Sequence, residues 1–582
     1  MLKETVKTLL GSVREYKKAS ILTSATIAGE VLVECFIPLV MAELIDVMSG
    51  GDMLPIIKYG IALLIMAMVS LGFGIASGWY GATASCGFAK NLRQDLFFKV
   101  QDYAFADIDK FSTSSLVTRL TTDITNVQMA YQMILRIAVR TPLMLIFSVI
   151  MSISINAKMS LIFAGIVPFL GVALFLIIRK VMPIFKRIFK KYDAMNNSVQ
   201  ENVSGIRVVK SFVREDYEKQ KFFKTSDEVR ADFTYVDKIL AFNNPLMVFS
   251  VYLAMILICV FGAHMIIDSV ETELTTGQLS SLLSYSVQIL AALQMLSMVF
   301  VMITISAESA NRICEVLKHE STLTNPENPI YEVADGSIEF ENVSFRYSKN
   351  SSRYALKDIN LSIKQGETIG ILGGTGSAKT TLIQLISRLY DVTEGSVKVG
   401  GRDVREYDLK TLRDQVAVVL QKNVLFAGTI KENLRWGDKE ASDEELERIC
   451  KLAQADEFIQ QFPDKYDTYI EQGGTNVSGG QKQRLCIARA LLKKPQIIIL
   501  DDSTSAVDTK TDALIRKAFR EEIPDTTKLI IAQRVSSIQD ADKIIVLDGG
   551  KIVEAGTHEE LIALGGIYCE VHDSQTKGKE AC

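Results

Sequence analysis

The sequence predicts an α-helical membrane domain followed by a soluble α/β domain with a phosphate-binding loop. Three observations support this fold class. The chain has 582 residues, which is too many for one hydrophobic core, so at least two domains are expected. The long apolar runs lie almost entirely within residues 1–310. Beyond residue 330, a short apolar strand, a glycine-rich turn and an amphipathic helix follow one another.

Six apolar segments are candidates for transmembrane helices. Each has about the 20 mostly apolar residues that a spanning helix needs. They are followed by a connection over 316–336, so we expect a membrane domain over 1–315 and a soluble domain over 337–582. Because six such runs do not fit one soluble core, a soluble protein with buried helices is disfavoured. The segments lie at about 20–45, 56–80, 134–156, 159–181, 245–267 and 279–305.

The connections between these segments alternate between short turns and two long polar stretches, 82–133 and 182–244. Helical periodicity in the long stretches predicts helical extensions outside the membrane. Lysine and arginine gather beside the long stretches, whereas Asp46, Asp52 and Asp268 occupy the opposite loops. By the positive-inside rule, the long stretches, both termini and the soluble domain are cytoplasmic. We therefore expect a multi-pass protein of the cytoplasmic (inner) membrane.

Composition excludes several other classes. The net charge of −4 argues against a general nucleic-acid partner. The eight cysteines are scattered and contain no C-x-x-C pair, which argues against a disulfide framework or a zinc site. The expected partners are instead the lipid bilayer and a hydrophobic or amphipathic small molecule or peptide.

Ionisable residues within the predicted spans need an explanation, because each is costly in hydrocarbon. Glu30 and Glu34 lie one helical turn apart in the first span, and Arg136 and Arg140 have the same spacing near the start of the third. Two interpretations are open. In the first, the glutamates pair with the arginines, or the arginines are exposed at the inner interface. In the second, the glutamates form an acidic patch for a cationic substrate.

The sixth span offers further candidates for substrate contacts. Methionine side chains adapt to varied apolar shapes, so a methionine-rich helix face suits a variable ligand. A core or lipid-facing position is the alternative for the same residues. The candidates are Gln288, Gln294, Met295, Met298 and Met302.

A phosphate-binding loop is predicted at the start of the soluble domain. The strand "TIGIL" enters a glycine-rich turn and then a helix, and G-x-x-x-x-G-K-[ST] maps onto residues 373–380. Ala378 stands where the last glycine of the pattern belongs. Alanine is tolerable there if its φ is helical and strained if its φ is positive. Lys379 would reach the β- and γ-phosphates, and the Thr380 hydroxyl would bind Mg²⁺.

Two further motifs point to anion and metal chemistry. "SGGQ" at 478–481 precedes a helix and predicts a second anion-binding helix N-terminus. One nucleotide does not need two such ends, so the second would serve a nucleotide held by a neighbouring domain. Farther along, the apolar run "IIIL" leads directly into Asp501 and Asp502. Two acids at the end of a buried strand favour a metal or phosphate site.

Together these motifs resemble one subunit of a type IV ABC exporter, which has six transmembrane helices followed by a nucleotide-binding domain. The resemblance covers almost the whole chain and implies ATP and Mg²⁺ as ligands. It implies that Tyr347 stacks on adenine, that Gln421 lies near Mg²⁺ and that Asp501 supports Mg²⁺. It places the D-loop at 505–508 and coupling helices near 105–118 and 202–212. The implied Walker A loop consists of Gly373, Gly374, Thr375, Gly376, Ser377, Ala378, Lys379, Thr380 and Thr381, and the implied signature of Val477, Ser478, Gly479, Gly480 and Gln481.

Two residues depart from the family pattern at the positions that the resemblance assigns to hydrolysis. The catalytic residue after the Walker B aspartate is normally glutamate. Here it is Asp502, which is shorter by one methylene, or about 1.5 Å. The switch histidine is replaced by Gln533 in "IIAQRVSS". Glutamine can donate a hydrogen bond to a γ-phosphate but cannot carry a proton. We therefore expect the site built on this chain's Walker motifs to bind ATP and hydrolyse it slowly.

The functional hypothesis is an ATP-driven exporter half that acts as the degenerate-site subunit of a heterodimer. Its partner would be a second half-transporter with the glutamate and histidine intact, and its substrates amphipathic drugs, lipids or peptides. The alternatives are an ATP-gated or regulatory membrane protein and a homodimeric lipid or peptide flippase. An importer ATPase is disfavoured, because importers usually keep membrane and ATPase parts on separate chains.

Overall fold

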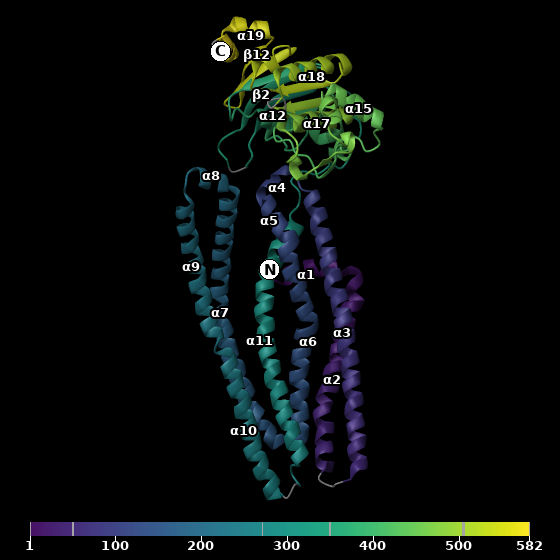
Figure 1. Ribbon diagram of the computed structural model, residues 1–582, viewed down its shortest axis with the longest axis vertical. Helices are drawn as coiled ribbons and strands as arrows, with labels where there is room; N and C mark the ends of the chain where they lie inside the picture. Colours follow the sequence, from purple (N-terminus) through teal and green to yellow (C-terminus); the bar gives the residue numbers. More distant parts are fainter. Residues whose placement is uncertain (1, 49–51, 270–271, 349–350, 503–506, 581–582) are drawn as a thin grey trace. The chain divides into compact units, whose positions relative to one another are not determined.

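The computed structural model describes the chain except residues 1, 49–51, 270–271, 349–350, 503–506 and 581–582. The chain forms two compact units (Figure 1). One unit comprises residues 1–101 and 112–319, and the other comprises residues 102–111 and 320–582. The short segment 102–111 thus belongs with the C-terminal unit although it lies in the N-terminal half of the sequence.

The first unit is entirely helical in its described part. Its long helices are α2 (Lys17–Met48), α3 (Met53–Gln101), α6 (Ile124–Ile155), α7 (Ala157–Ser204), α9 (Glu215–Leu240), α10 (Asn243–Ser269) and α11 (Thr276–Lys318). Short helices are α1 (Leu2–Leu10), η1 (Gly11–Tyr16), α5 (Thr113–Thr118), the π-helix η2 (Arg119–Asp123) and α8 (Ile206–Ser211). The predicted helical extensions are present, because 82–133 and 182–244 are largely helical and α3 and α7 each run well beyond the length that one span requires.

Five helical stretches in the described part of the chain are long and apolar enough to cross a membrane. They are Met53–Gln101, Thr113–Ile155, Ala157–Phe185, Glu215–Ser269 and Thr276–Lys318. They contain five of the six predicted segments. The first predicted segment also forms a helix, α2, but α2 is not among the five. It carries the acidic residues Glu30, Glu34 and Glu43 within its apolar run.

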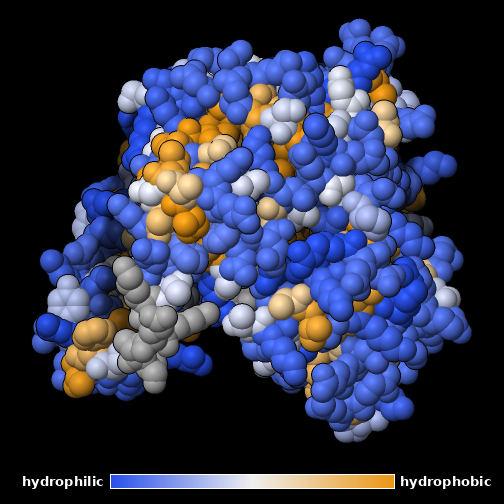
Figure 2. All heavy atoms as spheres, turned by 90° about the horizontal axis from the view of Figure 1, so that it is seen from above, coloured by the Kyte–Doolittle hydropathy of each residue, from blue (hydrophilic) through white to orange (hydrophobic). Residues whose placement is uncertain are grey.

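The pattern of buried and exposed side chains in the helical unit fits helices surrounded by lipid better than helices of a soluble core. Large apolar side chains remain exposed along the long helices, for example Leu64 at 64% and Ile267 at 75%. Small apolar clusters join the helices instead. One contains Ile27, Val31 and Cys35 of α2 packed against α6, and others join α7, α10 and α11. The face of the molecule shown in Figure 2, which is seen from above along the long axis of Figure 1, is by contrast mostly hydrophilic, with hydrophobic residues in separate patches.

The second unit is built on a six-stranded sheet with the order β12-β11-β3-β10-β9-β6. Its strands are β3 (Thr368–Gly373), β6 (Val416–Val419), β9 (Ile497–Asp501), β10 (Thr527–Ile531), β11 (Lys543–Asp548) and β12 (Lys551–Gly556). All are parallel except β12, which is antiparallel to β11. A second, antiparallel sheet has the order β2-β1-β4-β5, from β1 (Ile338–Phe345), β2 (Leu356–Ile363), β4 (Glu394–Val399) and β5 (Arg402–Asp403).

Near-continuous apolar strands explain why both faces of the six-stranded sheet are covered. In β9, Ile498 and Leu500 face one hydrophobic cluster, whereas Ile497 and Ile499 face another. Helices α15 (Asp443–Leu452), α16 (Asp456–Gln460) and α17 (Gly479–Leu492) contribute to the first cluster, and α12 (Lys379–Ile386) to the second. The remaining elements are β7 (Gly428–Thr429), β8 (Tyr469–Ile470), α4 (Phe105–Phe111), α13 (Leu409–Gln415), α14 (Ile430–Leu434), α18 (Thr509–Glu522), α19 (His558–Leu564), α20 (Ile567–Glu580) and the short turns η3 (Val404–Glu406), η4 (Lys465–Asp467), η5 (Gln472–Gly474) and η6 (Val535–Ser537). The predicted α/β fold is confirmed.

Candidate nucleotide site

The predicted site residues meet at the carboxyl ends of four neighbouring parallel strands. β3, β10, β9 and β6 are adjacent in that order. The glycine-rich loop follows β3, Gln533 follows β10, Asp502 follows β9 and Gln421 follows β6. In open α/β sheets, ligands bind outside the carboxyl ends of the strands. Segments that are far apart in the sequence are thereby placed around one site.

The glycine-rich loop forms one wall of a pocket of about 530 Å³. Residues 376–381 line this pocket together with Tyr347, Arg353 and Tyr354. Gly376 has φ +81°, a conformation that other residues adopt only with strain. The Lys379 ammonium donates hydrogen bonds to the carbonyl oxygens of Gly373 (2.9 Å) and Gly374 (2.8 Å). Burial lowers the pKa of Lys379, and the nearby Asp501 and Asp502 raise it.

Ala378 is strained, which settles the question that the sequence left open. It caps α12 in the left-handed conformation, with φ +72° and ψ +25°. This conformation costs an L-residue with a Cβ roughly 1–2 kcal/mol. The glycine of the family pattern has no such cost, so alanine is a real departure in this loop and not a neutral one.

Substitutions at Ala378 should therefore change stability in opposite directions. Ala378→Gly relieves the strain but adds freedom to the unfolded chain, so the net gain should be at most about 1 kcal/mol. Ala378→Val should lower stability by about 1 kcal/mol or more, because a β-branched residue at positive φ is a true outlier. Thermal unfolding of the full chain with and without ATP measures both. Equal melting temperatures for the valine variant and the parent would contradict the strain.

Thr380 and Asp501 form the part of the site that suits a divalent cation. The Thr380 hydroxyl donates to Asp501 Oδ2 over 3.0 Å. Asp501 is only 4% exposed, and burial raises its pKa. Hydroxyl and carboxylate oxygens are the hard ligands that Mg²⁺ prefers, and a bound cation would compensate the buried carboxylate. The residues present thus fit a Mg²⁺ ion, which would offset phosphate charge when bound.

Asp502 is held by both of the glutamines that the sequence singled out. Gln533 Nε2 donates to Asp502 Oδ2 over 2.7 Å, and Gln421 Nε2 approaches the same oxygen at 3.4 Å. Asp502 is 8% exposed and has φ +49°. Burial raises its pKa, and the two amide hydrogen bonds lower it. One oxygen of this carboxylate is therefore already engaged as an acceptor before any water could approach it.

Gln575 is a residue of this site that sequence reasoning missed. It lies on α20, and its side chain bridges the backbone on either side of Arg534. Val535 N donates to Gln575 Oε1, and Gln575 Nε2 donates to the Gln533 carbonyl oxygen, each over 2.9 Å. Gln575 thus fixes the loop that carries Gln533. No motif marks it, because the contact exists only once α20 packs against this loop. Arg353 and Tyr354 in the pocket wall were also missed, because no motif marks them either.

Tyr347 lies beside the glycine-rich loop, where the resemblance requires it. Its hydroxyl lies 2.8 Å from Thr381 Oγ1, and its ring is 55% exposed. It meets Phe345 and Tyr390 edge to face, with ring centroids 4.9 and 5.3 Å away. An exposed, firmly held ring can stack on a flat base. The structure thus places this aromatic group and the loop in the same pocket.

The signature segment forms an intact helix N-terminus that faces solvent. Ser478 is the N-cap of α17, and its side chain accepts a hydrogen bond from Gln481 N. Gln481 Oε1 accepts in return from Ser478 N over 2.9 Å, which completes a capping box. Ser478, Gly479 and Gly480 are not in the pocket lined by Lys379. Val477, the first residue of the signature, is buried, at 8% exposure, so its side chain packs inside the unit. Of the predicted D-loop, residues 505 and 506 lie outside the described residues.

The two predicted coupling segments differ in their surroundings. α4 belongs to the α/β unit, where Asp109 Oδ2 accepts a hydrogen bond from the Tyr390 hydroxyl over 2.9 Å. Asp107 Oδ2 accepts from Ser321 Oγ and Thr322 N, each at 3.2 Å. By contrast α8 has no buried residue, and the adjoining Phe212 and Val213 are 74% and 81% exposed. The contacts of α8 in the described part of its unit thus leave each of its residues at least partly exposed.

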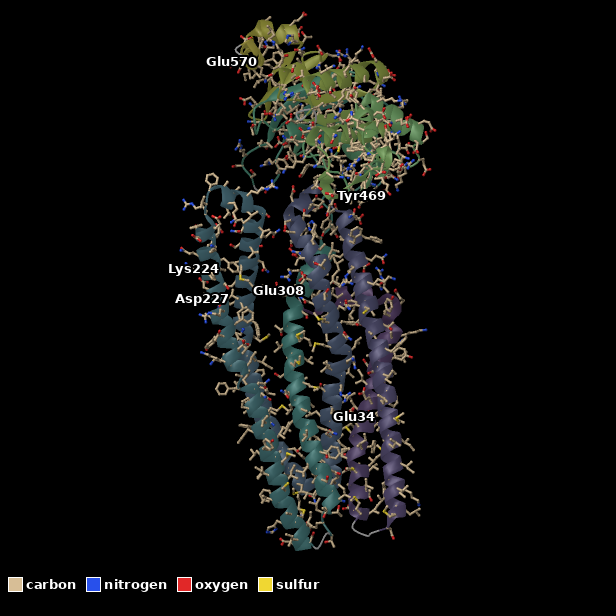
Figure 3. All side chains as sticks on the ribbon, viewed as in Figure 1. Glu34, Lys224, Asp227, Glu308, Tyr469 and Glu570 are labelled. Carbon is tan, nitrogen blue, oxygen red and sulfur yellow. The ribbon has the colours of Figure 1, made fainter. Side chains whose placement is uncertain are left out.

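The candidate substrate residues divide into two groups. Arg140 pairs with Glu30 Oε1 and Glu34 Oε2, both at 2.6 Å, which is the mutual pairing that the sequence allowed (Figure 3 labels Glu34). Gln288 accepts from the Ser148 hydroxyl over 3.1 Å. Met295 and Met298 are exposed, at 50% and 61%, and Gln294 is half-buried. Of the residues proposed for substrate contact, Glu30 lines a described pocket, together with Met302.

Comparison with known proteins agrees with the geometry. Residues 21–293 match the family model of the ABC transporter transmembrane region, and residues 356–505 match that of the ABC transporter. The chain is 36% identical over 556 residues to the uncharacterized ABC transporter ATP-binding protein YfiB of Bacillus subtilis (strain 168), covering 95% of this chain and 96% of that protein. It is 34% identical over 570 residues to the similarly named protein Rv1273c of Mycobacterium tuberculosis (strain ATCC 25618 / H37Rv), covering 97% of each.

A further relative is YfiC, again an uncharacterized ABC transporter ATP-binding protein of Bacillus subtilis (strain 168). It is 29% identical over 578 residues, covering 98% of this chain and 94% of that protein. Near-complete coverage means that the relatives share both parts of the chain and not only the nucleotide-binding motifs. The chain therefore belongs to the ABC transporters, as a multi-pass, exporter-type half-transporter that joins a transmembrane region to an ATP-hydrolysing domain.

Proposed function

We propose that this chain is the degenerate-site subunit of a heterodimeric ABC exporter that moves amphipathic substrates across the cytoplasmic membrane. The observation that carries the proposal is that one oxygen of the Asp502 carboxylate already accepts hydrogen bonds from Gln533 and Gln421. A catalytic base must come within hydrogen-bond reach of the water that it deprotonates. Asp502 is about 1.5 Å shorter than the family's glutamate, and its Oδ2 already accepts from Gln533 at 2.7 Å.

The rest of the site supports nucleotide binding without fast hydrolysis. Lys379 lies in the loop and would exchange its hydrogen bonds to Gly373, Gly374 and Ser377 for phosphate, and Thr380 with Asp501 suits Mg²⁺. When bound, Mg²⁺ would neutralise phosphate charge, and Tyr347 would stack on the base. Gln533 can hold a γ-phosphate oxygen but cannot carry a proton. A site with these properties retains ATP and so stabilises the closed pair of nucleotide-binding domains.

The intact signature supports a heterodimer over a homodimer. In a head-to-tail pair, each site joins the Walker motifs of one chain to the signature of the other. A homodimer would place Asp502 and Gln533 in both sites, and neither would hydrolyse well. The capping box at Ser478 and Gln481 stabilises α17 itself, and the exposed N-terminus that it leaves suits an anion held by an opposing Walker site. We therefore infer a partner half-transporter with glutamate and histidine at the matching positions.

The exposed segment at α8 also favours a paired assembly. α4 makes its hydrogen bonds within the α/β unit of its own chain. Phe212 and Val213 beside α8 are left exposed to solvent. Exposed apolar side chains on a cytoplasmic segment suit a protein contact. In the proposed heterodimer, α8 would contact the nucleotide-binding domain of the partner.

Neutralising Asp502 should hardly affect the assembled transporter. Asp502→Asn keeps the size of the side chain, and we expect ATP turnover of the pair to fall by less than about 3-fold. The matching glutamate→glutamine change in the partner should lower turnover by on the order of 10²-fold, as expected for loss of a positioned base. Steady-state ATP hydrolysis of both purified pairs makes the comparison. Equal losses would refute the asymmetry.

Orientation is testable separately. We propose that the short loops at Asp52 and Asp268 are external, because the basic residues lie on the other side. Asp52→Cys or Asp268→Cys in a cysteine-free background should react with an impermeant thiol reagent added to intact cells. Lys439→Cys, on the α/β unit, is the matched control and should react only after permeabilisation. Labelling of the loop variants only after permeabilisation would reverse the proposed topology.

A further inference from the structure

Two arginines one turn apart on α6 have unequal surroundings. Arg140 uses both terminal nitrogens of its guanidinium, with Nη1 on Glu30 Oε1 and Nη2 on Glu34 Oε2, each at 2.6 Å. The side chains of Glu30, Glu34 and Arg140 are 13%, 24% and 31% exposed, so the triad is partly buried. Both glutamates thus share one counter-ion within the unit. A cationic ligand would have to compete with a guanidinium already in place.

Arg136 has no ion pair or side-chain hydrogen bond among the residues that the structure describes. Its aliphatic stem passes Gly81 of α3, where a Cβ would lie 3.3 Å from Arg136 Cδ. The absence of a side chain at Gly81 therefore leaves room for this arginine. Arginine within a spanning segment is costly unless it meets water, a counter-ion or a ligand. Its five N–H donors are directed by a planar fork that matches phosphate or carboxylate.

Arg136 lines a pocket of about 390 Å³ between α2, α6 and α11. Its other walls include Met129, Met133 and Met302, with Ile27 and Ile137. Methionine and isoleucine offer an adaptable apolar surface. The charged groups that line the pocket are Arg136, Arg140 and Glu30, which sum to one positive charge. Glu34 pairs with Arg140 but does not line the pocket, and with it the four groups sum to zero, so the anion-binding group is Arg136 and not a net charge of the pocket.

We propose that this pocket binds an amphiphile with an anionic head, which Arg136 holds through its guanidinium while the methionines contact the tail. The proposal rests on the proposed function, because it names the substrate class of the same exporter. Arg140 acts here as a positioning residue that pairs with Glu30 and Glu34 and offsets one of their two negative charges, which weakens their repulsion of the anion. A bidentate contact between a guanidinium and a phosphate is among the stronger hydrogen-bonded pairs in proteins.

Equilibrium binding without ATP tests the proposal on the purified assembly that contains this chain. The probes share one acyl chain and differ in the head: a glycerol phosphate monoester, the same glycerol ester without phosphate, and an alkyltrimethylammonium of equal length. Inorganic phosphate is the fourth probe and tests whether a head alone suffices. We expect the phosphate-headed amphiphile to bind at least about 10-fold more tightly than the other three.

Arg136→Gln should weaken binding of the phosphate-headed amphiphile by about 10-fold or more and leave the neutral ester within about 2-fold. Arg136→Lys, which keeps the charge without the fork, should recover part of that loss. Thermal unfolding checks that each variant is folded. Gln132→Ala, at a neighbouring position in the same pocket, is the matched control and should change binding of all probes alike.

Tighter binding of the alkylammonium, or equal loss of every probe in Arg136→Gln, would overturn the proposal. Inorganic phosphate that binds as tightly as the amphiphile would show a plain anion site and would also overturn it. Because no hydrolysis is needed, the measurement is separable from the proposed function. An active ATPase that ignores anionic amphiphiles would refute this inference alone, and binding without any ATP-dependent cycle would refute only the exporter proposal.

Discussion

Ser478→Arg in this chain should lower ATP turnover of the proposed heterodimer by on the order of 10²-fold or more, because it would remove anion stabilisation from the site that the proposal assigns to the partner. Ser478 caps α17 and leaves that helix N-terminus facing solvent. Arginine cannot form the capping box with Gln481, and its bulk would occupy the place that an opposing γ-phosphate needs. The loss should equal that from the partner's glutamate→glutamine change. Steady-state ATP hydrolysis of the purified pair measures it.

Two controls separate this effect from a loss of folding. Ser478→Asn keeps a good N-cap without adding a long cation, so its turnover should stay within several-fold of the parent. ATP binding at this chain's own pocket should be unchanged in Ser478→Arg, since Ser478 is not among the residues that line it. Wild-type turnover in the arginine variant would contradict the idea that the partner uses this signature.

The second large effect is a gain of hydrolysis. Asp502→Glu combined with Gln533→His should restore the base and the switch residue together. We expect hydrolysis at this chain's own site to rise by about 10²-fold, the order of loss attributed to a base misplaced by about 1 Å. The measurement uses a pair whose other site has been inactivated by glutamate→glutamine in the partner, so that only this site contributes.

The single variants indicate which group limits the site. Asp502→Glu alone should give part of the gain, because the longer carboxylate reaches water but still faces the Gln533 amide. Gln533→His alone should give little, since Asp502 remains too short. A gain from Gln533→His alone that matched the double variant would show that reach is not the limitation. No gain in any of the three would mean that another feature, such as the strained Ala378, disables the site.

The sequence predicted those parts of the molecule that depend on local pattern. Lys379, Thr380 and Asp501 carry motifs whose spacing is fixed by a strand, a tight turn and a helix, and the structure brings them together. The long helical extensions were likewise visible as periodic polar stretches. Buried parallel strands read as short apolar runs, so their carboxyl ends, and hence Asp502, could be found before the sheet order was known.

Other features depend on tertiary contacts or on backbone angles, and no local sequence pattern indicates them. The φ of Ala378 is set by the whole loop, so the sequence could pose the question of strain but not answer it. Gln575 reaches the Gln533 loop only because α20 packs there. The pairing of both glutamates with Arg140, and not one each with Arg136 and Arg140, depends on the rotation of α2 against α6.

The predicted domain limits at 315 and 337 remain predictions. The two compact units of the structure meet along the chain at residues 319 and 320, and residues 102–111 belong to the C-terminal unit. A single cut in the sequence could not anticipate this, because α4 contributes Asp107 and Asp109 to hydrogen bonds with Ser321 and Tyr390. The α/β unit is therefore completed by a segment from the middle of the membrane half.

The central claim is that this chain's own nucleotide site holds ATP and hydrolyses it poorly. The most direct measurement is ATP hydrolysis by this chain purified alone, compared with its Asp502→Asn variant, alongside ATP binding by both. The account predicts that both proteins bind ATP and that the parent hydrolyses it no faster than the variant within about 3-fold. Brisk hydrolysis by a dimer of the parent chain, abolished by Asp502→Asn, would contradict the account.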